Sequence, residues 1–210
     1  MIIIGLTGSI GMGKSTAAQL LRKQGVPVHE ADAAVHKLFA RGGGAVAAVG
    51  ALFPKAIVKG AVDRKKLGQI VYGNRRLLKK LEAVVHPLVH QATARWLDEQ
   101  RKAKFKLVVL DIPLLFEADR EETVDAIWVV SAPPDVQKAR VLARPGMDMA
   151  RFKKILSHQV KDSLKRKRAD EVIPTGDGLK LTDLHLKLAL KRAKTVPAYA
   201  WRDYWKSLAT

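Results

Sequence analysis

Apolar residues occur along this chain in short runs of the length expected for β-strands. The first run, Met1–Thr7, is apolar almost throughout, which is the pattern of a strand covered on both faces in a parallel sheet. Shorter runs follow at Val26–Glu30, Leu107–Asp111, Ala126–Val130 and Glu171–Ile173. The pattern therefore predicts five strands.

Between the strands, the apolar positions recur with a helical period. Residues 15–24 are good helix formers, Leu20 and Leu21 belong to their apolar face, and Gly25 stands where a C-terminal cap is expected. Strands that alternate with helices indicate an α/β fold in which helices flank a parallel sheet.

The middle of the chain has a different pattern. From Asp32 to Lys106 no comparably clear strand is found, whereas Lys65–Tyr72 and Arg75–Gln100 have helical periodicity. The predicted division is a core of residues 1–32 and 107–210 and a helical insertion of residues 33–106.

Composition narrows the class of protein. The 210 residues, 48% of them hydrophobic, suffice for one domain with an inserted subdomain. The sequence has no cysteine, which excludes a disulfide framework, a thiolate zinc site and a cysteine nucleophile. It starts without a basic leader and has no stretch near the roughly 18 apolar residues of a membrane span. We expect a soluble cytoplasmic protein without a membrane partner, and we favour a monomer.

The formal net charge of +18 admits two interpretations. Lysine and arginine on one face attract phosphate, whether it belongs to a nucleic acid, a membrane or a nucleotide. The same residues also make up the ordinary solvated surface of a protein with a high isoelectric point. Basic residues cluster at Arg75–Lys80 and Lys161–Arg168, and charge alone does not choose between the interpretations.

A glycine-rich motif follows the first strand. Its residues are Gly8-Ser9-Ile10-Gly11-Met12-Gly13-Lys14-Ser15, which match the P-loop pattern G-x-x-x-x-G-K-[ST] between a buried strand and a helix. The backbone N–H groups of Gly11, Met12 and Gly13 are expected to point at phosphate, and the helix N-terminus adds positive potential. The sequence therefore predicts an ATP site.

Three side chains of the motif have predicted roles. Lys14 reaches the β and γ phosphate oxygens, Ser15 holds Mg²⁺, and Thr16 donates its hydroxyl to an inner phosphate. A Rossmann dinucleotide site is disfavoured, because Thr16 stands where the third glycine belongs.

Asp32 is the first candidate for a general base. It comes just after the second strand, at the carboxyl edge of the sheet, where ligands of open α/β folds bind. A carboxylate there can accept the proton of an attacking hydroxyl. Position alone leaves an equal alternative, a helix N-cap before residues 33–39. Glu30 is a weaker rival for the base.

Further candidates follow later elements. Asp111 ends a strand, as a carboxylate that contacts Mg²⁺ through water often does in P-loop enzymes. Arg140 and Arg144, four apart on a short predicted helix, would present two guanidinium groups on one face. That arrangement suits closure over a polyphosphate, and an exposed basic face is the alternative. His86, taken alone, is more typical of a packed or capping histidine than of a ligand contact.

The motifs stand in a specific order along the chain. After the P-loop come Glu30-Ala31-Asp32, His86-Pro87-Leu88, Asp111-Ile112-Pro113-Leu114-Leu115-Phe116-Glu117, Gln137 with Arg140 and Arg144, and Gln159. In this combination the chain resembles the dephospho-CoA kinase family, from its N-terminus to about Ile173.

The resemblance implies a reaction and a fold. The reaction is transfer of the ATP γ-phosphoryl group to the ribose 3′-hydroxyl of dephospho-CoA, the last step of coenzyme A synthesis, with ATP and Mg²⁺ required. The resemblance makes Asp32 the general base, places His86 on the acceptor side, and puts Arg140 and Arg144 on a mobile lid near residues 140–160. It also implies a P-loop NTPase fold similar to nucleoside monophosphate kinases, with a helical substrate-side region.

The chain departs from the family pattern at two positions. Glu30 replaces the first aspartate of an Asp-Ala-Asp element. After Ile173 the family usually continues with Asp-Asn and glycine, whereas this chain has Pro174-Thr175-Gly176. The aromatic ending Trp201–Trp205 lies beyond the resemblance, and we expect it to pack back onto the sheet.

Two other functions remain open. A kinase for another nucleoside or nucleotide would be distinguished by the acceptor that consumes ATP. A basic nucleic-acid-binding P-loop protein would use Lys161–Arg168 and would lose affinity steeply with salt. Stacking on bases would also require aromatic residues within that run, which has none, so nucleic acid is disfavoured as a partner.

Overall fold

The computed structural model describes residues 1–209 of the chain. They form two compact units. The first consists of Met1–His29 and Glu99–Lys206, and the second consists of Glu30–Asp98 with the residues from Ser207 on. No helix within residues 1–209 is long and apolar enough to cross a membrane.

The first unit is built on the five-stranded sheet that the sequence predicts. Its strands are β1 (Ile2–Thr7), β2 (Val28–Glu30), β5 (Leu107–Asp111), β6 (Ala126–Ser131) and β7 (Glu171–Pro174), in the order β2-β5-β1-β6-β7. Strand β1 pairs in parallel with β5 and β6, and β6 pairs in parallel with β7. Because β1 is the central strand, the loop that follows it emerges in the middle of the carboxyl edge.

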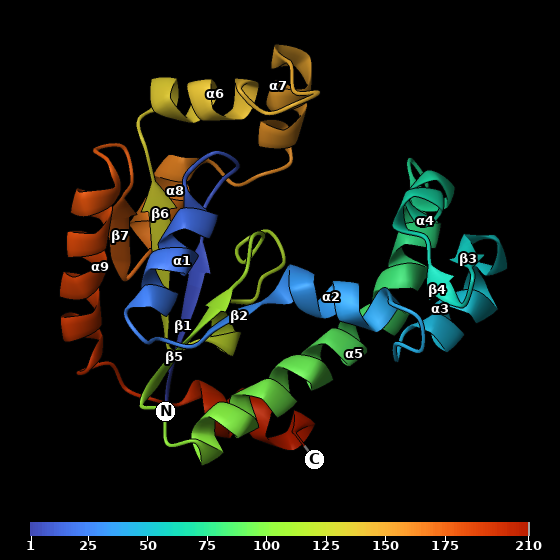
Figure 1. Cartoon of the computed structure of the whole chain (residues 1–210), viewed down its shortest axis with the longest axis horizontal. Coiled ribbons are helices and arrows are strands. Elements are labelled where there is room, and N and C mark those ends of the chain that lie inside the picture. The colour runs from blue at the N-terminus through green and yellow to red at the C-terminus, as the bar shows by residue number, and fades with distance from the viewer. Residues whose placement is uncertain (210) are drawn as a thin grey trace. The chain divides into compact units, whose positions relative to one another are not determined.

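Two helices cover one face of this sheet, α1 (Lys14–Lys23) and α9 (Leu179–Ala193) (Figure 1). Their apolar residues share a buried cluster with the strands, which includes Ile4, Leu6, Ala17, Leu21, Val130, Ile173, Leu186 and Ala189. The predicted apolar face of α1 is therefore the face that packs, and Gly25 follows the helix with a positive φ of 78°. The shared cluster holds α1, and the motif that opens it, against the sheet.

Three short helices belong to the same unit: α6 (Pro134–Leu142), α7 (Met149–Ser157) and α8 (Asp162–Arg168). Figure 1 shows α6 and α7 beyond the carboxyl end of the sheet, next to the loop that joins β1 to α1. A short 3₁₀ turn, η2 (Glu121–Thr123), precedes β6. The predicted lid region therefore consists of helices.

The aromatic ending of the chain packs against the first unit. Segment η3 (Trp201–Trp205) is a π-helical turn, and η4 (Lys206–Leu208) is a 3₁₀ turn. Trp205 is fully buried and its Nε1 donates to the Thr123 carbonyl at 2.7 Å. The carboxylate of Asp125 accepts from the N–H of Ile3 in β1 and from the N–H groups of Tyr199 and Ala200. Trp205 thus packs against η2, the turn that precedes β6, and packing onto the sheet itself stays a prediction.

The second unit is mainly helical, as the sequence predicts for this stretch. Its elements are α2 (Ala31–Phe39), α3 (Val46–Leu52), η1 (Pro54–Ala56), β3 (Ile57–Val58), β4 (Ala61–Val62), α4 (Arg64–Val71) and most of α5 (Arg75–Lys102). Phe39, Val49, Phe53, Leu67 and Val89 belong to its own buried cluster.

A small antiparallel hairpin of β3 and β4 was not expected, because strands of two residues are too short to show an alternating pattern. The unit spans Glu30–Asp98, whereas residues 33–106 were predicted as the insertion.

Candidate active site

The phosphate loop requires glycine at two of its positions. Gly11 and Gly13 have φ values of 79° and 86°, a conformation that other residues rarely adopt. A Cβ atom on Gly11 would also stand 2.6 Å from Val141 and 2.9 Å from the Gln137 carbonyl. Gly13 is the N-cap of α1, so the loop passes directly into the helix N-terminus. The loop therefore has the backbone shape that directs amide groups at a phosphate.

Two glutamines hold the middle of this loop at Ile10. Nε2 of Gln137, on α6, donates to the Ile10 carbonyl at 2.7 Å. The Ile10 N–H donates to Oε1 of Gln159, which follows α7, at 3.1 Å. Gln159 belongs to the segment predicted as the lid, near residues 140–160, and Gln137 lies three residues before that segment.

A pocket of about 670 Å³ opens beside the loop, a volume in the usual range for small-molecule sites. It is lined by Gly8, Ser9, Ile10, Gly11, Met12, Gly13, Lys14, Ser15, Thr16, Pro113, Arg140, Arg144, Ile155, Gln159, Thr175, Gly178, Leu179 and Thr182. The predicted phosphate-binding residues and both predicted arginines therefore line one pocket. Met12 contributes backbone there, because it is 3% exposed and its side chain belongs to the core.

Lys14 forms an ion pair with Asp111 at the end of β5. Asp111 is 6% exposed, so this carboxylate meets the ammonium group in a largely dry setting. The Asp111 carboxylate therefore balances the positive charge of Lys14. A bound polyphosphate would compete with Asp111 for the same ammonium group.

The two arginines do not share a helix face as the sequence suggested. Helix α6 ends at Leu142, so only Arg140 is helical. Arg144 precedes Pro145, and a residue before proline is disfavoured in the helical region. Arg140 bonds to Thr175 through two nitrogens, at 2.6 Å to its carbonyl and 3.3 Å to its hydroxyl. Arg144 is exposed, and within residues 1–209 its side chain has no hydrogen bond.

Asp32 lies in the second unit, in the first turn of α2. The N-cap of that helix is Glu30, so the alternative interpretation of Asp32 as the capping residue is wrong. Strand β2 passes into α2 without an intervening loop, which moves the helix start earlier than the sequence suggested. The Asp32 side chain is exposed. A carboxylate in a first turn is stabilised by the helix dipole.

His86 lies within α5, one residue before Pro87. It is exposed, and its ring stacks on His90 with centroids 6.4 Å apart. Because it lies inside the helix, the capping alternative is wrong. The stacking agrees with the alternative of a packed histidine, and the ligand contact stays a prediction.

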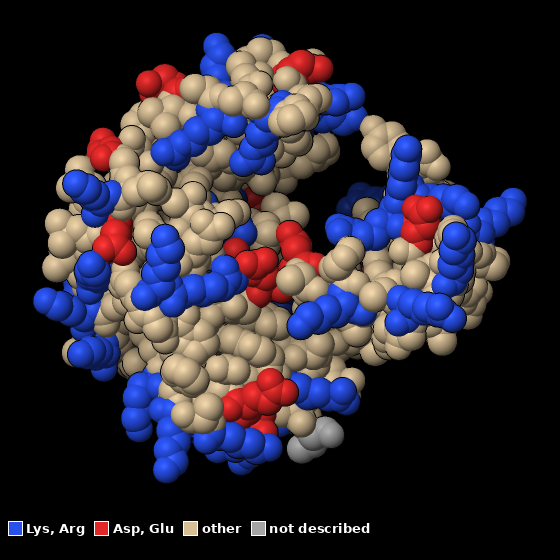
Figure 2. Space-filling view, viewed as in Figure 1, with Lys and Arg blue, Asp and Glu red and all other residues tan. Residues whose placement is uncertain are grey.

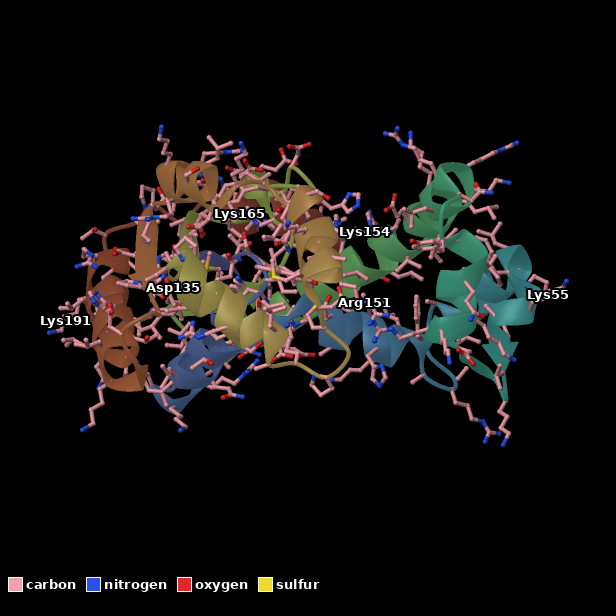
Figure 3. The ribbon with its side chains drawn as sticks, turned by 90° about the horizontal axis from the view of Figure 1, so that it is seen from above. Lys55, Asp135, Arg151, Lys154, Lys165 and Lys191 are labelled. Carbon is pink, nitrogen blue, oxygen red and sulfur yellow. The ribbon has the colours of Figure 1, made fainter. Side chains whose placement is uncertain are left out.

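The structure contains a buried ion pair near the lid that the sequence did not predict. Lys165 on α8 is fully buried, and its Nζ lies 2.8 Å from Oε1 of Glu117. The same oxygen accepts the Val160 N–H at 2.9 Å, so Glu117 fixes the residue next to Gln159. The run of charges around Lys165 gave no signal for burial. In Figure 3, Lys165 lies among the packed elements, whereas Lys191 on α9 points away from the ribbon.

This pair changes the interpretation of the basic run Lys161–Arg168. Lys165 is not available at the surface, and Arg168 pairs with Glu121 and covers the Phe116 ring at 4.6 Å. Figure 2 shows that lysine and arginine are spread over the visible surface rather than gathered in one place. The run is thus partly a structural feature, which weakens the nucleic-acid alternative.

A family model described as dephospho-CoA kinase matches residues 2–180 of the chain. A dephospho-CoA kinase from Paramagnetospirillum magneticum is 60% identical over 166 residues, which is 79% of this chain and 78% of the relative. A crystal structure of a Thermus thermophilus protein is 39% identical and superposes with a TM-score of 0.75 over 93% of this chain and 98% of that chain. A shikimate kinase from Acinetobacter baumannii, 18% identical, has a TM-score of 0.51 over 94% and 96%, which shows likeness of fold alone.

Proposed function

The chain belongs to the dephospho-CoA kinase family, and from this membership we propose how its residues divide the reaction. The family catalyses ATP-dependent phosphorylation of dephospho-CoA at the ribose 3′-hydroxyl, the last step of coenzyme A synthesis, and this chain is such a kinase. The P-loop NTPase fold is confirmed. The observation that carries the residue assignment is the pocket in which the phosphate loop, Arg140 and Arg144 meet.

The phosphate loop binds ATP through its backbone and two side chains. The amides of Gly11, Met12 and Gly13 face the phosphates, and Lys14 exchanges part of its contact with Asp111 for the β and γ oxygens. Thr16 donates to an inner phosphate.

Mg²⁺ fits the oxygen donors of this site. Ser15 lines the pocket, and the Asp111 carboxylate pairs with Lys14, which also lines it. In sites of this kind Mg²⁺ keeps several waters and is held by one or two protein oxygens together with the substrate phosphates. When bound, Mg²⁺ neutralises charge on the transferring phosphoryl group.

Asp32 is the general base. Its carboxylate takes the proton of the ribose 3′-hydroxyl as that oxygen bonds to the γ-phosphorus and the bond from phosphorus to the bridging oxygen of ADP breaks. His86 contacts the acceptor, and residues 33–106 form the acceptor-binding domain.

Arg140 and Arg144 clamp the phosphates from the lid near residues 140–160. Their positive charge stabilises the equatorial oxygens of the transition state, and closure of the lid excludes water that would otherwise hydrolyse ATP.

Cytoplasmic location and a monomeric state stay predictions. Light scattering on the purified protein tests the monomeric state directly.

The test of the function is a coupled ADP-release assay with Mg·ATP and four acceptors: dephospho-CoA, adenosine, AMP and shikimate. We expect turnover with dephospho-CoA and a product phosphorylated at the 3′ position. Lys14→Ala should lose both ATP binding and turnover. Turnover with another acceptor alone would contradict the substrate assignment while leaving the ATP site intact.

A further inference from the structure

Thr175 stands at the position where the sequence departs from the family pattern, and it is buried beneath the phosphate loop. It follows β7, is 4% exposed, and its N–H donates to the Ser131 carbonyl at 2.9 Å. Its hydroxyl oxygen lies 2.8 Å from the Met12 carbonyl and 3.2 Å from that of Ser131. A hydroxyl has one proton, and the shorter distance assigns it to Met12.

The same residue contacts the lid on its other side. Arg140 donates from Nη2 to the Thr175 carbonyl at 2.6 Å and from Nη1 to the Thr175 hydroxyl at 3.3 Å. The hydroxyl thus donates to the phosphate loop and accepts from the lid arginine at once, which an apolar side chain of the same shape cannot do.

Packing fixes the Thr175 side chain as closely as its hydrogen bonds do. A Cβ atom on Gly13 would stand 3.1, 3.2 and 3.4 Å from Oγ1, Cβ and Cγ2 of Thr175. These two residues are therefore in tight contact. The loop peptide between Met12 and Gly13 rests on Thr175, so a shift of one moves the other.

We propose that Thr175 is a positioning residue for phosphoryl transfer. It fixes the position of the Arg140 guanidinium relative to the Met12–Gly13 peptide. The inference rests on the proposed clamp role of Arg140. Both groups line the same pocket, so a fixed geometry between them presents donors to one polyphosphate without reorganisation. Arg144 has no such anchor within residues 1–209, and it is the arginine left to move with the lid.

The experiment compares Thr175→Val, which keeps the shape and removes the hydroxyl, with Thr175→Ser, which keeps the hydroxyl. We expect Thr175→Val to lower kcat/KM for ATP about tenfold, as for the loss of a charge-assisted hydrogen bond. Thr175→Ser should recover most of this, and KM for dephospho-CoA should not change. If Thr175→Val does not fold, Thr175→Ala removes the same hydroxyl without adding a methyl group.

Thr123→Val is the matched control. Thr123 is also buried, and its hydroxyl donates to the Arg120 carbonyl at 2.7 Å, but it precedes β6 and lies at the opposite edge of the sheet from the phosphate loop. Loss of the Thr123 hydroxyl in Thr123→Val should lower Tm and leave kcat/KM for ATP unchanged. A merely structural role for Thr175 predicts the same behaviour for Thr175→Val.

A double-mutant cycle with Arg140→Ala separates the inference from the proposed function. In the Arg140→Ala background, Thr175→Val should cost less than about threefold, because the group it positions is gone. An equal factor in both backgrounds would overturn the positioning role alone. Wild-type kcat/KM for Arg140→Ala would contradict the clamp role of Arg140, and the positioning role with it.

Discussion

Around the phosphate loop, separate elements each contribute a hydrogen bond that fixes it: Gln137 from α6, Gln159 after α7 and Thr175 after β7. In the second unit, the two residues predicted to meet the acceptor are exposed, and neither is fixed in this way. The side chain of Asp32 has no hydrogen bond within residues 1–209, and His86 stacks on His90.

The difference follows from what each region must do. The charge that develops on a transferring phosphoryl group is met best by donors that are already in place, since they need no reorganisation during the reaction. The acceptor must enter and its product must leave, and a group that stays hydrated until the acceptor binds permits both. The phosphate side therefore forms a network of hydrogen bonds within the protein, whereas we expect the predicted acceptor residues to gain their partners from the substrate.

The largest effect is expected at the acceptor side, from Asp32→Asn. Loss of the general base should lower kcat by about 10²–10⁴ fold while the Kd for ATP stays unchanged, because Asp32 does not belong to the phosphate pocket. Steady-state transfer rates and calorimetric ATP binding give the two values. Glu30→Gln is the matched variant two residues away, and it should keep a rate near that of the unmodified protein.

Two results would contradict the assignment of Asp32 as the general base. A full transfer rate for Asp32→Asn would remove Asp32 from the base role. An equal loss in Glu30→Gln would mean that the start of α2, rather than one carboxylate, supports the reaction.

The next effect concerns stability of the phosphate side. Lys165→Ala should lower the free energy of unfolding by about 3–5 kcal/mol, because it leaves the Glu117 carboxylate buried without its cation. Denaturant unfolding measures this. Lys167→Ala, an exposed cation on the same helix, should change stability by less than about 0.5 kcal/mol.

A double variant, Glu117→Gln with Lys165→Met, sharpens this prediction. Removal of both charges should recover much of the lost stability, because no buried charge is left unpaired. If the double variant is as unstable as Lys165→Ala, the loss of the ion pair itself, rather than the unpaired Glu117 carboxylate, lowers the free energy of unfolding.

These two predictions also mark what a sequence can reveal. The five strands and the phosphate motif were predictable because buried strands and a glycine-rich turn leave periodic or strict patterns. The burial of Lys165 was not, because a lysine within a basic run has the same pattern whether it faces solvent or a carboxylate more than 40 positions away. The end of α6 at Leu142 was not predictable to the residue, because Pro145 marks where a helix must stop but not how many residues earlier it ends.

A smaller effect is expected from Gln159→Ala. The Ile10 N–H would lose its acceptor, and one net hydrogen bond corresponds to an increase of about fivefold in KM for ATP. KM for dephospho-CoA should stay constant, since the contact belongs to the phosphate side. The neighbouring exposed residue supplies the control, and His158→Ala should leave both KM values unchanged. If KM for dephospho-CoA rose as well, the two sides would be coupled more closely than their contacts indicate.

The smallest effect is expected from Asp183→Asn. This substitution tests the contact that holds the C-terminal end of α1, the helix that follows the phosphate loop, against α9. Asp183 on α9 accepts from Gln24, just after α1, at 2.7 Å and pairs with Lys187 at 2.7 Å. The hydrogen bond from Lys187 and then that from Gln24 lower the pKa of this carboxyl below its usual value. A lowered folded-state pKa stabilises the protein above the unfolded value of about 3.9, and this stabilisation is lost as pH falls through the folded pKa. Asp183→Asn should therefore lower Tm slightly at neutral pH, and the difference from the unmodified protein should vanish in acid. Asp177→Asn is the control, because Asp177 is exposed and its side chain has no hydrogen bond within residues 1–209. A pH-independent difference for Asp183→Asn would show that the charge of Asp183 does not hold α9 to α1.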